Sequence, residues 1–135
     1  MFQTPLILTI GLFTLSTLPS SSLSPSVEIE NIRVIDGDTF IINELERVRV
    51  ACINSAEKST PEGIEDWHTA QDYFNSSSTI FLDRIGLDKY GRTIASVSNE
   101  QGVNLALFLL EREAAEYTPY NHKTYCQNQI PLERR

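Results

Sequence analysis

Apolar and polar residues alternate with a period of two in the segments 27–35 and 39–53, and this alternation predicts β-strands. The second segment reads as a hairpin whose turn lies at Asn43–Glu46. In its second arm the valines fall on one face, whereas Arg49 falls on the opposite, polar face. The early part of the chain therefore predicts three strands.

The period changes to that of a helix after residue 59. Thr60 is suited to cap the helix, Pro61 to its first turn, and a mostly apolar stripe follows through Trp67 and Phe74. Further on, the pattern predicts strands at 79–83 and 93–98, a polar loop with glycines at 84–92, and an apolar helix at 103–113. Strands and helices do not alternate along the chain as they do in a doubly wound sheet. We therefore predict an α+β, mainly β, mixed barrel.

The first 27 residues contain no charged side chain. The apolar run Pro5–Leu15 is followed by small polar residues, among which Ser20 and Ser22 suit a cleavage site. No Lys or Arg precedes the run, which departs from the usual pattern. We predict a signal peptide or hydrophobic leader over residues 1–26, a domain over 27–135, and a secreted or extracytoplasmic protein; an uncleaved N-terminal segment that anchors the protein is the alternative.

Composition narrows the function only slightly. At 135 residues the chain has room for one domain, and its net charge of −7 argues against a basic protein that coats nucleic acid. A few local cations are still enough to bind phosphate groups. Two histidines and two cysteines give no zinc pattern. We favour free thiols at Cys52 and Cys126, because Cys52 lies in an apolar strand; a disulfide in an exported protein is the alternative.

Two carboxylates lie one residue apart where a buried strand begins. Asp36 and Asp38 flank Gly37 in the stretch VIDGDTFII. An ordinary turn accounts for this pattern, since glycine and aspartate are common turn residues. Carboxylates are, however, also hard oxygen ligands for a metal ion. The stretch alone leaves both interpretations open.

Other polar residues follow at the ends of predicted strands. Arg49 is followed by the stretch INSAE, and a later loop contains DKYGR. Each residue taken alone fits an ordinary surface position. Together they offer what phosphodiester hydrolysis requires, namely a metal on oxygen ligands, an acid or base near a water, and planar cations for the phosphate. Asp38 and Asn54 are candidates to bind the metal, and Glu57 is the candidate to act on the water. Arg49 and Arg92 are candidates to bind the phosphate.

Four separated segments resemble the staphylococcal nuclease-like (thermonuclease) family. They are VIDGDTF, RVRVACINSAE, LDKYGR and VNLAL, and the resemblance runs from about Ile32 to Tyr120. It implies a five-stranded OB-fold barrel with two to three packed helices. It also implies a Ca²⁺-dependent phosphodiesterase that cuts DNA and RNA and leaves 3′-phosphate and 5′-hydroxyl ends. The expected partner is a DNA or RNA substrate, for a monomer without an obligate protein partner.

The resemblance assigns roles to individual residues. Asp38 would bind calcium with Asp36 in its outer shell, and the carbonyl of Ser55 would be a further calcium ligand. Glu57 would orient or deprotonate the attacking water. Substrate phosphates and the nucleotide pocket would involve five residues: Arg49, Arg92, Lys89, Tyr90 and Tyr117.

The chain also departs from the family pattern. Asn54 occupies the position of a second calcium-binding aspartate, and Ala56 replaces a proline. An amide oxygen still coordinates calcium, but the site loses one negative charge, so we expect weaker binding. Residues 121–135 have no clear apolar period and contain Pro131, where the family has a third helix. The alternatives are therefore a catalytically lapsed OB module that binds nucleic acid or a protein, or a purely structural secreted domain.

Overall fold

The computed structural model describes residues 24–135. The predicted leader therefore lies outside the described residues, apart from its last three. Within the described part, none of the helices is long and apolar enough to cross a membrane.

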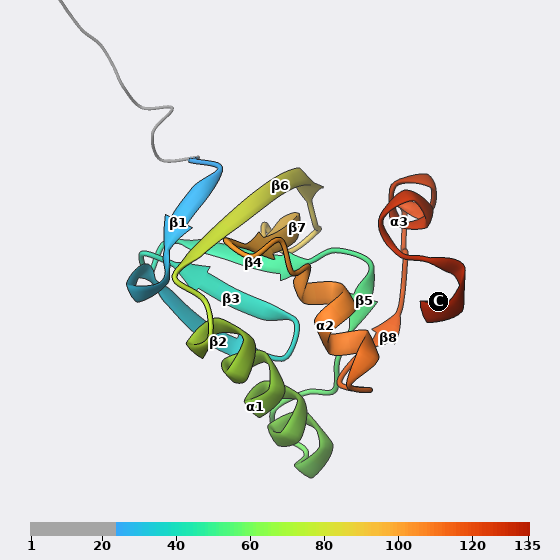
Figure 1. Cartoon of the computed structure of the whole chain (residues 1–135), viewed down its shortest axis with the longest axis horizontal. Coiled ribbons are helices and arrows are strands. Elements are labelled where there is room, and N and C mark those ends of the chain that lie inside the picture. The colour runs from blue at the N-terminus through green and yellow to red at the C-terminus, as the bar shows by residue number, and fades with distance from the viewer. Residues whose placement is uncertain (1–23) are drawn as a thin grey trace, which may run out of the picture.

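A six-stranded sheet, strongly curled into a half-barrel, forms the centre of the domain, and helices pack against it (Figure 1). Its strand order is β1-β6-β7-β4-β3-β2, and a two-stranded ribbon pairs β5 with β8. Neighbouring strands of the large sheet are antiparallel except β4 and β7, which are parallel. The strands are β1 (Ser26–Glu28), β2 (Ile32–Asp36), β3 (Thr39–Ile42), β4 (Glu46–Val50), β5 (Ile53–Asn54), β6 (Thr79–Leu87), β7 (Thr93–Asn99) and β8 (Glu116–Tyr117).

Three α-helices complete the α+β fold. They are α1 (Pro61–Asn75), α2 (Leu105–Glu111) and α3 (Lys123–Gln129), and short 3₁₀ turns occur at η2 (Ile29–Asn31) and η3 (Leu132–Arg134). Helix α1 packs on β2 and on α2, and α2 packs on β7. The described part of the chain thus confirms a mixed, mainly β fold, with a six-stranded curled sheet rather than an evident five-stranded closed barrel.

The core lies between the concave face of the sheet and the first two helices. Strand β7 alternates buried and half-buried residues along its whole length, as the sequence pattern predicts. Phe40 of β3 contacts Phe74 of α1 with ring centroids 5.1 Å apart. Tyr73 contacts Phe108 of α2 at 5.2 Å. Aromatic contacts therefore join α1 to the sheet and α2 to α1.

Capping residues set where the first two helices begin. The hydroxyl of Thr60 accepts a hydrogen bond from the N–H of Gly63, and Pro61 follows it, which confirms the predicted start of α1. Helix α2 begins later than predicted, with Asn104 as its N-cap. The side-chain oxygen of Asn99 accepts hydrogen bonds from the N–H groups of Gln101 and Val103, and so holds this segment in a turn.

Two strand predictions are wrong in their limits. The predicted strand 27–35 is interrupted by η2, where the N–H of Ile29 donates to the carbonyl of Ser78 and the chain moves from β6 to β3 as pairing partner. Strand β6 continues to Leu87, so the first four residues of the predicted loop 84–92 are strand. A register shift between Arg84 and Gly86 lets the strand continue to follow β7.

The prediction of free thiols is also wrong, because Cys52 and Cys126 form a disulfide. Cys52 has a positive φ of 76°, so the chain turns sharply after β4 instead of continuing as an apolar strand. The N–H of Thr118 donates to the carbonyl of Cys52 and brings the tail to this turn. The tail then forms α3, in which Cys126 is the buried residue. A helix of this length shows too few apolar positions for its period to be recognised.

Candidate active site

Arg49 of β4 lies in the interior of the site and not on a solvated face. Its residue is 8% exposed. Nη1 donates to the carbonyls of Val50 and Ile53, both at 2.8 Å, because the turn at Cys52 brings the Ile53 carbonyl back toward β4. These two bonds fix the plane of the guanidinium group.

Asp38 is the carboxylate nearest to this arginine. Its Oδ2 lies 3.4 Å from Nη2 of Arg49, and both side chains are about nine-tenths buried. The same oxygen accepts a hydrogen bond from the N–H of Ser55 at 2.8 Å, and Oδ1 accepts one from the hydroxyl of Thr39 at 3.0 Å. The carboxylate that follows the aspartate–glycine turn therefore holds both the arginine and the next loop.

Two further side chains reach Arg49. The amide oxygen of Asn54 accepts a hydrogen bond from Nη2 at 3.0 Å. Nη2 also lies 3.5 Å from the hydroxyl of Tyr120, whose ring centroid is 5.8 Å from Cζ of Arg49. Sequence reasoning missed Tyr120, since only the turn with its positive φ of 48° directs this residue back to the site.

Glu57 belongs to the same loop and is exposed. Its backbone is fixed by the start of α1, because its carbonyl accepts hydrogen bonds from the N–H of Thr60 at 2.9 Å and from the Thr60 hydroxyl at 2.8 Å. The side chain is thus free to project from a loop whose backbone is held. Such an arrangement suits a group that acts on a water or a substrate.

A buried carboxylate, Asp66 of α1, was not singled out by the sequence. It is 7% exposed, and its Oδ2 accepts a hydrogen bond from the N–H of Ala56 at 3.0 Å. Burial raises the pKa of Asp66, the bond from Ala56 opposes that rise, and the charges of Glu65 and Asp38 add to it. The signal in the sequence is an acid on the buried side of an amphipathic helix.

Gly37 is required by the close approach of these elements. A Cβ atom at this position would lie 2.7 Å from Oγ of Ser55 and 3.1 Å from Cβ of Asp66. Oγ of Ser55 is buried, and no hydrogen-bond partner for it occurs among residues 24–135. The glycine between the two aspartates therefore lets the turn pack against the loop and α1.

Arg92 is held by its own turn. Nε donates to Oδ2 of Asp88 at 2.6 Å, and Oδ1 of Asp88 accepts the N–H groups of Tyr90 and Arg92, both at 2.9 Å. Burial alone would raise the pKa of Asp88, but these hydrogen bonds and the charge of Arg92 lower it below its usual value. Nζ of Lys89 and Cζ of Arg92 lie 5.2 Å and 5.5 Å from the exposed ring of Tyr90.

The sheet register places the start of β7, just after Arg92, beside the strand that carries Arg49. Val48 pairs with Thr93 and Arg49 with Ile94 in the parallel ladder between β4 and β7. Arg92 directly precedes Thr93, so it enters the sheet beside the strand that carries Arg49. Arg49 thus comes from β4 and Arg92 from the turn directly before the adjacent β7, and each has its own carboxylate partner.

A cleft of about 780 Å³ lies beside the loop. Asn54, Ser55 and Ala56 line it together with Tyr117, the residue expected in a nucleotide pocket. The other polar side chains in its walls are Glu62, Asp66, Glu113, Glu116, Arg134 and Arg135. Tyr117 itself lies in β8, where it pairs with Ile53 of β5.

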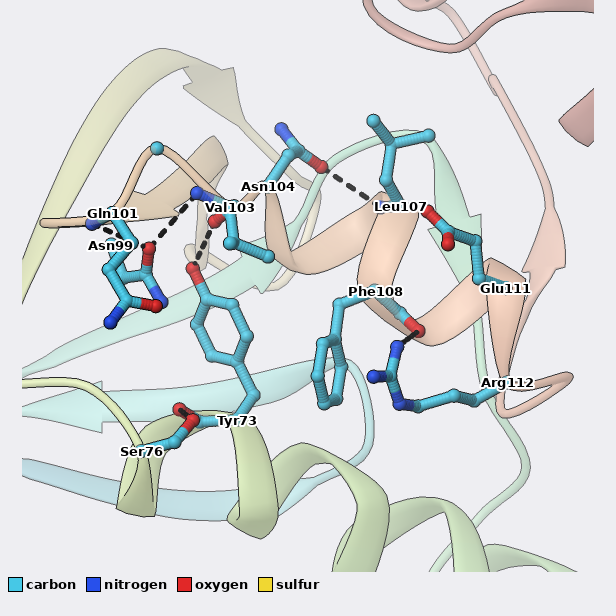
Figure 2. A pocket seen from close by; sticks show the side chains of 11 residues that line it. Tyr73, Ser76, Asn99, Gln101, Val103, Asn104, Leu107, Phe108, Glu111 and Arg112 are labelled. Carbon is cyan, nitrogen blue, oxygen red and sulfur yellow. Dashed lines mark hydrogen bonds between the residues drawn. The ribbon is translucent and has the colours of Figure 1, made fainter.

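Figure 2 shows a second pocket, of about 400 Å³, between α1, α2 and the loop that follows β7. Its polar groups bond to one another: the hydroxyl of Tyr73 donates to the carbonyl of Val103 at 2.7 Å, and Nη1 of Arg112 donates to the carbonyl of Phe108 at 3.2 Å. None of the sequence-predicted site residues lines this pocket. Its contacts join the two helices.

The donor set near Asp38 matches calcium in kind but is low in charge. Calcium takes six to eight oxygen ligands, and Asp38, the Asn54 amide oxygen and the Ser55 carbonyl are oxygen donors. Only the first is charged, and it faces Arg49. Within residues 24–135, no group of three or more acidic, histidine or cysteine side chains is placed to bind a metal. The three oxygen donors are thus of the kind that calcium binds, but a calcium ion here would need water and substrate as further ligands.

Comparison with known proteins finds no matching family model and no matching curated protein. The resemblance to the staphylococcal nuclease-like family therefore rests on the four segments and on the site residues described above.

Proposed function

We propose that this protein is a Ca²⁺-dependent nuclease, a phosphodiesterase that hydrolyses DNA and RNA to 3′-phosphate and 5′-hydroxyl ends. One observation carries the proposal: a buried guanidinium group is fixed by two backbone carbonyls beside a carboxylate, with an acidic loop at its edge. A permanently charged, oriented donor of this kind suits the charge that develops on a phosphoryl group.

Each residue has a defined task in this proposal. Arg49 and Arg92 donate to the non-bridging phosphate oxygens, and Glu57 takes a proton from the attacking water. Lys89 and Tyr90 contact a neighbouring phosphate from the exposed turn. The oxygen of the water forms a bond to phosphorus, and the bond from phosphorus to the 5′ oxygen breaks. The 5′ oxygen takes up a proton from solvent and leaves as the 5′-hydroxyl, and the phosphate remains on the 3′ side.

Calcium would be held by Asp38, the Asn54 amide oxygen and the Ser55 carbonyl. When bound, it supplies positive charge that polarises the phosphate and lowers the pKa of a bound water. Because one carboxylate contributes, we expect the protein to need a high calcium concentration.

We further propose that the curled sheet is a variant of the five-stranded OB-fold barrel, in which the short strand β1 extends the sheet edge beside β6. The substrate would lie across the site with Tyr117 near a base, and the protein would act as a monomer. The disulfide between Cys52 and Cys126 supports an oxidising compartment, and hence a secreted or extracytoplasmic location.

The test is cleavage of single-stranded DNA and of RNA by the full chain, with excess calcium and with a chelator. Arg92→Ala should abolish cleavage, whereas Arg112→Ala, a change of the same kind at an exposed arginine on the α2 side, should leave it unchanged. If the folded wild type leaves both substrates intact in excess calcium at several pH values, the proposal is wrong.

A second candidate is a catalytically lapsed OB module that binds nucleic acid or a protein partner. The observation that favours it is the bond from Arg49 to the Asn54 amide oxygen, at the position where a second carboxylate is expected. Asn54→Asp distinguishes the two. If this variant gains activity that the wild type lacks, the natural protein is a binder. If it lowers the calcium concentration required by an existing activity, the protein is an enzyme.

A further inference from the structure

The loop that carries Glu57 is held by three carboxylates through its backbone. Asp38 accepts from the N–H of Ser55 at 2.8 Å, and Asp66 accepts from the N–H of Ala56 at 3.0 Å. Asp36 accepts from the N–H of Lys58 at 3.3 Å. Two of these acids belong to the turn between β2 and β3, whereas Asp66 belongs to α1. Asp66 therefore connects α1 to the backbone directly before Glu57.

The start of α1 also holds the carbonyl group of Glu57. The N–H and the hydroxyl of Thr60 both donate to the Glu57 carbonyl. Gly63, in the first turn of α1, packs so closely that a Cβ atom there would lie 1.7 Å from that carbonyl oxygen and 2.2 Å from its carbon. The backbone of Glu57 is thus fixed between two attachments to one rigid helix.

Stability alone does not explain an acid at position 66. A carboxylate that is 7% exposed loses much of its hydration, and the charges of Glu65 and Asp38 are repulsive toward it. An apolar side chain avoids this cost of burying a charge, but it leaves the Ala56 N–H without its acceptor, so the two effects on stability oppose each other. What the carboxylate provides, and an apolar side chain does not, is an acceptor for the Ala56 N–H.

We propose that Asp66 is a positioning residue that sets the place of Glu57 in the catalytic site. This inference rests on the proposed nuclease function. Arg49 is fixed by the carbonyls of Val50 and Ile53, and Arg92 by Asp88, so loss of the Asp66 bond displaces Glu57 without displacing either arginine. The expected effect therefore falls on kcat and leaves KM almost unchanged.

The experiment compares Asp66→Leu with Asp72→Leu in the full chain. Asp72 lies on the same helix and is exposed. Asp66→Leu should lower kcat by about ten- to a hundred-fold, since a shift of about 1 Å in a catalytic group has effects of this size. The thermal midpoint should change little, because relief of the buried charge offsets the lost hydrogen bond from Ala56. Asp72→Leu should change neither kcat nor the thermal midpoint. Asp66→Asn retains an acceptor oxygen and should therefore keep most of the wild-type kcat.

Two further readouts separate positioning from general damage. In a Glu57→Gln background, Asp66→Leu should cause no additional loss of kcat, because both changes act through one group. Hydrogen exchange at the Ala56 amide should become faster in Asp66→Leu and not in Asp72→Leu. If leucine prevents folding, Asp66→Ala removes the acceptor without added bulk and answers the same question.

The possible outcomes distinguish this inference from the nuclease proposal. Unchanged exchange at Ala56, or a loss of kcat that adds fully to that of Glu57→Gln, overturns the role of Asp66. A wild-type chain that does not cleave, but whose Ala56 amide depends on Asp66, contradicts the nuclease while it supports the attachment of the loop to α1.

Discussion

Two arginine–carboxylate pairs lie at the two ends of β4, and they differ in how completely their groups are bonded. Glu46, at the start of the strand, receives both Nε and Nη2 of Arg84 at 2.8 Å, and its Oε2 also accepts the hydroxyl of Thr93 at 2.8 Å. Arg49, near the other end, lies 3.4 Å from Asp38. The first pair is a bidentate bond that joins β4, β6 and β7. The second is looser.

The looser pair has the features of a binding site. Arg49 donates to two carbonyls and to an amide oxygen, which orient it without neutralising its charge. An anion that enters the site can therefore compete with Asn54 and Tyr120 for Nη2. A fully bonded pair such as Arg84 with Glu46 has less to offer a ligand. One strand thus carries a structural pair and a candidate functional pair.

The largest expected effect comes from Arg49→Lys compared with Arg84→Lys. Lysine keeps the charge at position 49 but loses the planar fork. We expect kcat/KM for single-stranded DNA to fall by roughly 10²- to 10³-fold, the size of effect seen when one transition-state donor is removed. Arg84→Lys should retain activity and lose stability. Equal loss of activity in both variants would show that the two pairs do not differ in the way described.

Removal of the disulfide should be the largest change in stability. The bond closes a loop between Cys52 and Cys126, which are 74 residues apart. We expect Cys126→Ala to lower the free energy of unfolding by about 3–4 kcal/mol, measured by urea denaturation. Activity at low urea should also fall, because the turn at Cys52 holds the Ile53 carbonyl that orients Arg49. A variant with unchanged stability would indicate that the tail contributes little to the fold.

Glu46→Gln should test the structural pair directly. The substitution removes the negative charge that faces the largely buried guanidinium of Arg84, so we expect a loss of about 2 kcal/mol in the free energy of unfolding. Glu44→Gln, at the exposed pair with Arg33, is the control and should change the free energy of unfolding far less, because solvent screens this pair. Similar losses for the two variants would mean that burial of the Glu46 pair has no energetic consequence.

The smallest effect is the pH dependence of stability. The hydrogen bond from Arg84 is the main cause that lowers the pKa of Glu46 in the folded protein, with contributions from Thr93 and the charge of Arg84. Its stabilisation is fully present above the unfolded pKa of about 4.3 and is lost as the pH falls through the lower folded pKa. Unfolding curves between neutral pH and pH about 3 should show this slope in the wild type and a reduced slope in Glu46→Gln.

Much of the fold can be predicted from local patterns. Alternation identifies β3, β4 and β7, and Thr60 with Pro61 identifies the start of α1. The errors occur where distant segments decide the outcome. Ser78 interrupts the first strand, β7 extends β6, and the disulfide orders a tail that has no period of its own. These interactions join residues that no short sequence window contains.

In the candidate site too, residues within local motifs could be predicted and residues brought in by distant packing could not. The structure brings together Asp38, Arg49, Asn54 and Ser55, as the sequence motifs suggest, with Glu57 on the same loop. Asp66 and Tyr120 could not be predicted, since each reaches the site from an element whose placement depends on packing. Sequence also gives the wrong surroundings for Arg49. A polar residue on the polar face of an alternating strand is expected to be exposed to solvent. Here the chain after β4 folds over Arg49 and buries it.

The parallel pairing of β4 and β7 has a consequence for how the protein acquires its function. Arg49 and Arg92 become neighbours only when two strands meet that are separated in the chain by α1 and β6. Contacts of this long range require closure of a large loop and form slowly. During refolding, the hairpin of β3 and β4 can assemble early from local contacts, but Arg49 and Arg92, the proposed phosphate-binding pair, come together only with the pairing of β4 and β7. Competence to bind the substrate would thus report completion of the whole fold, and partly folded molecules would remain inactive.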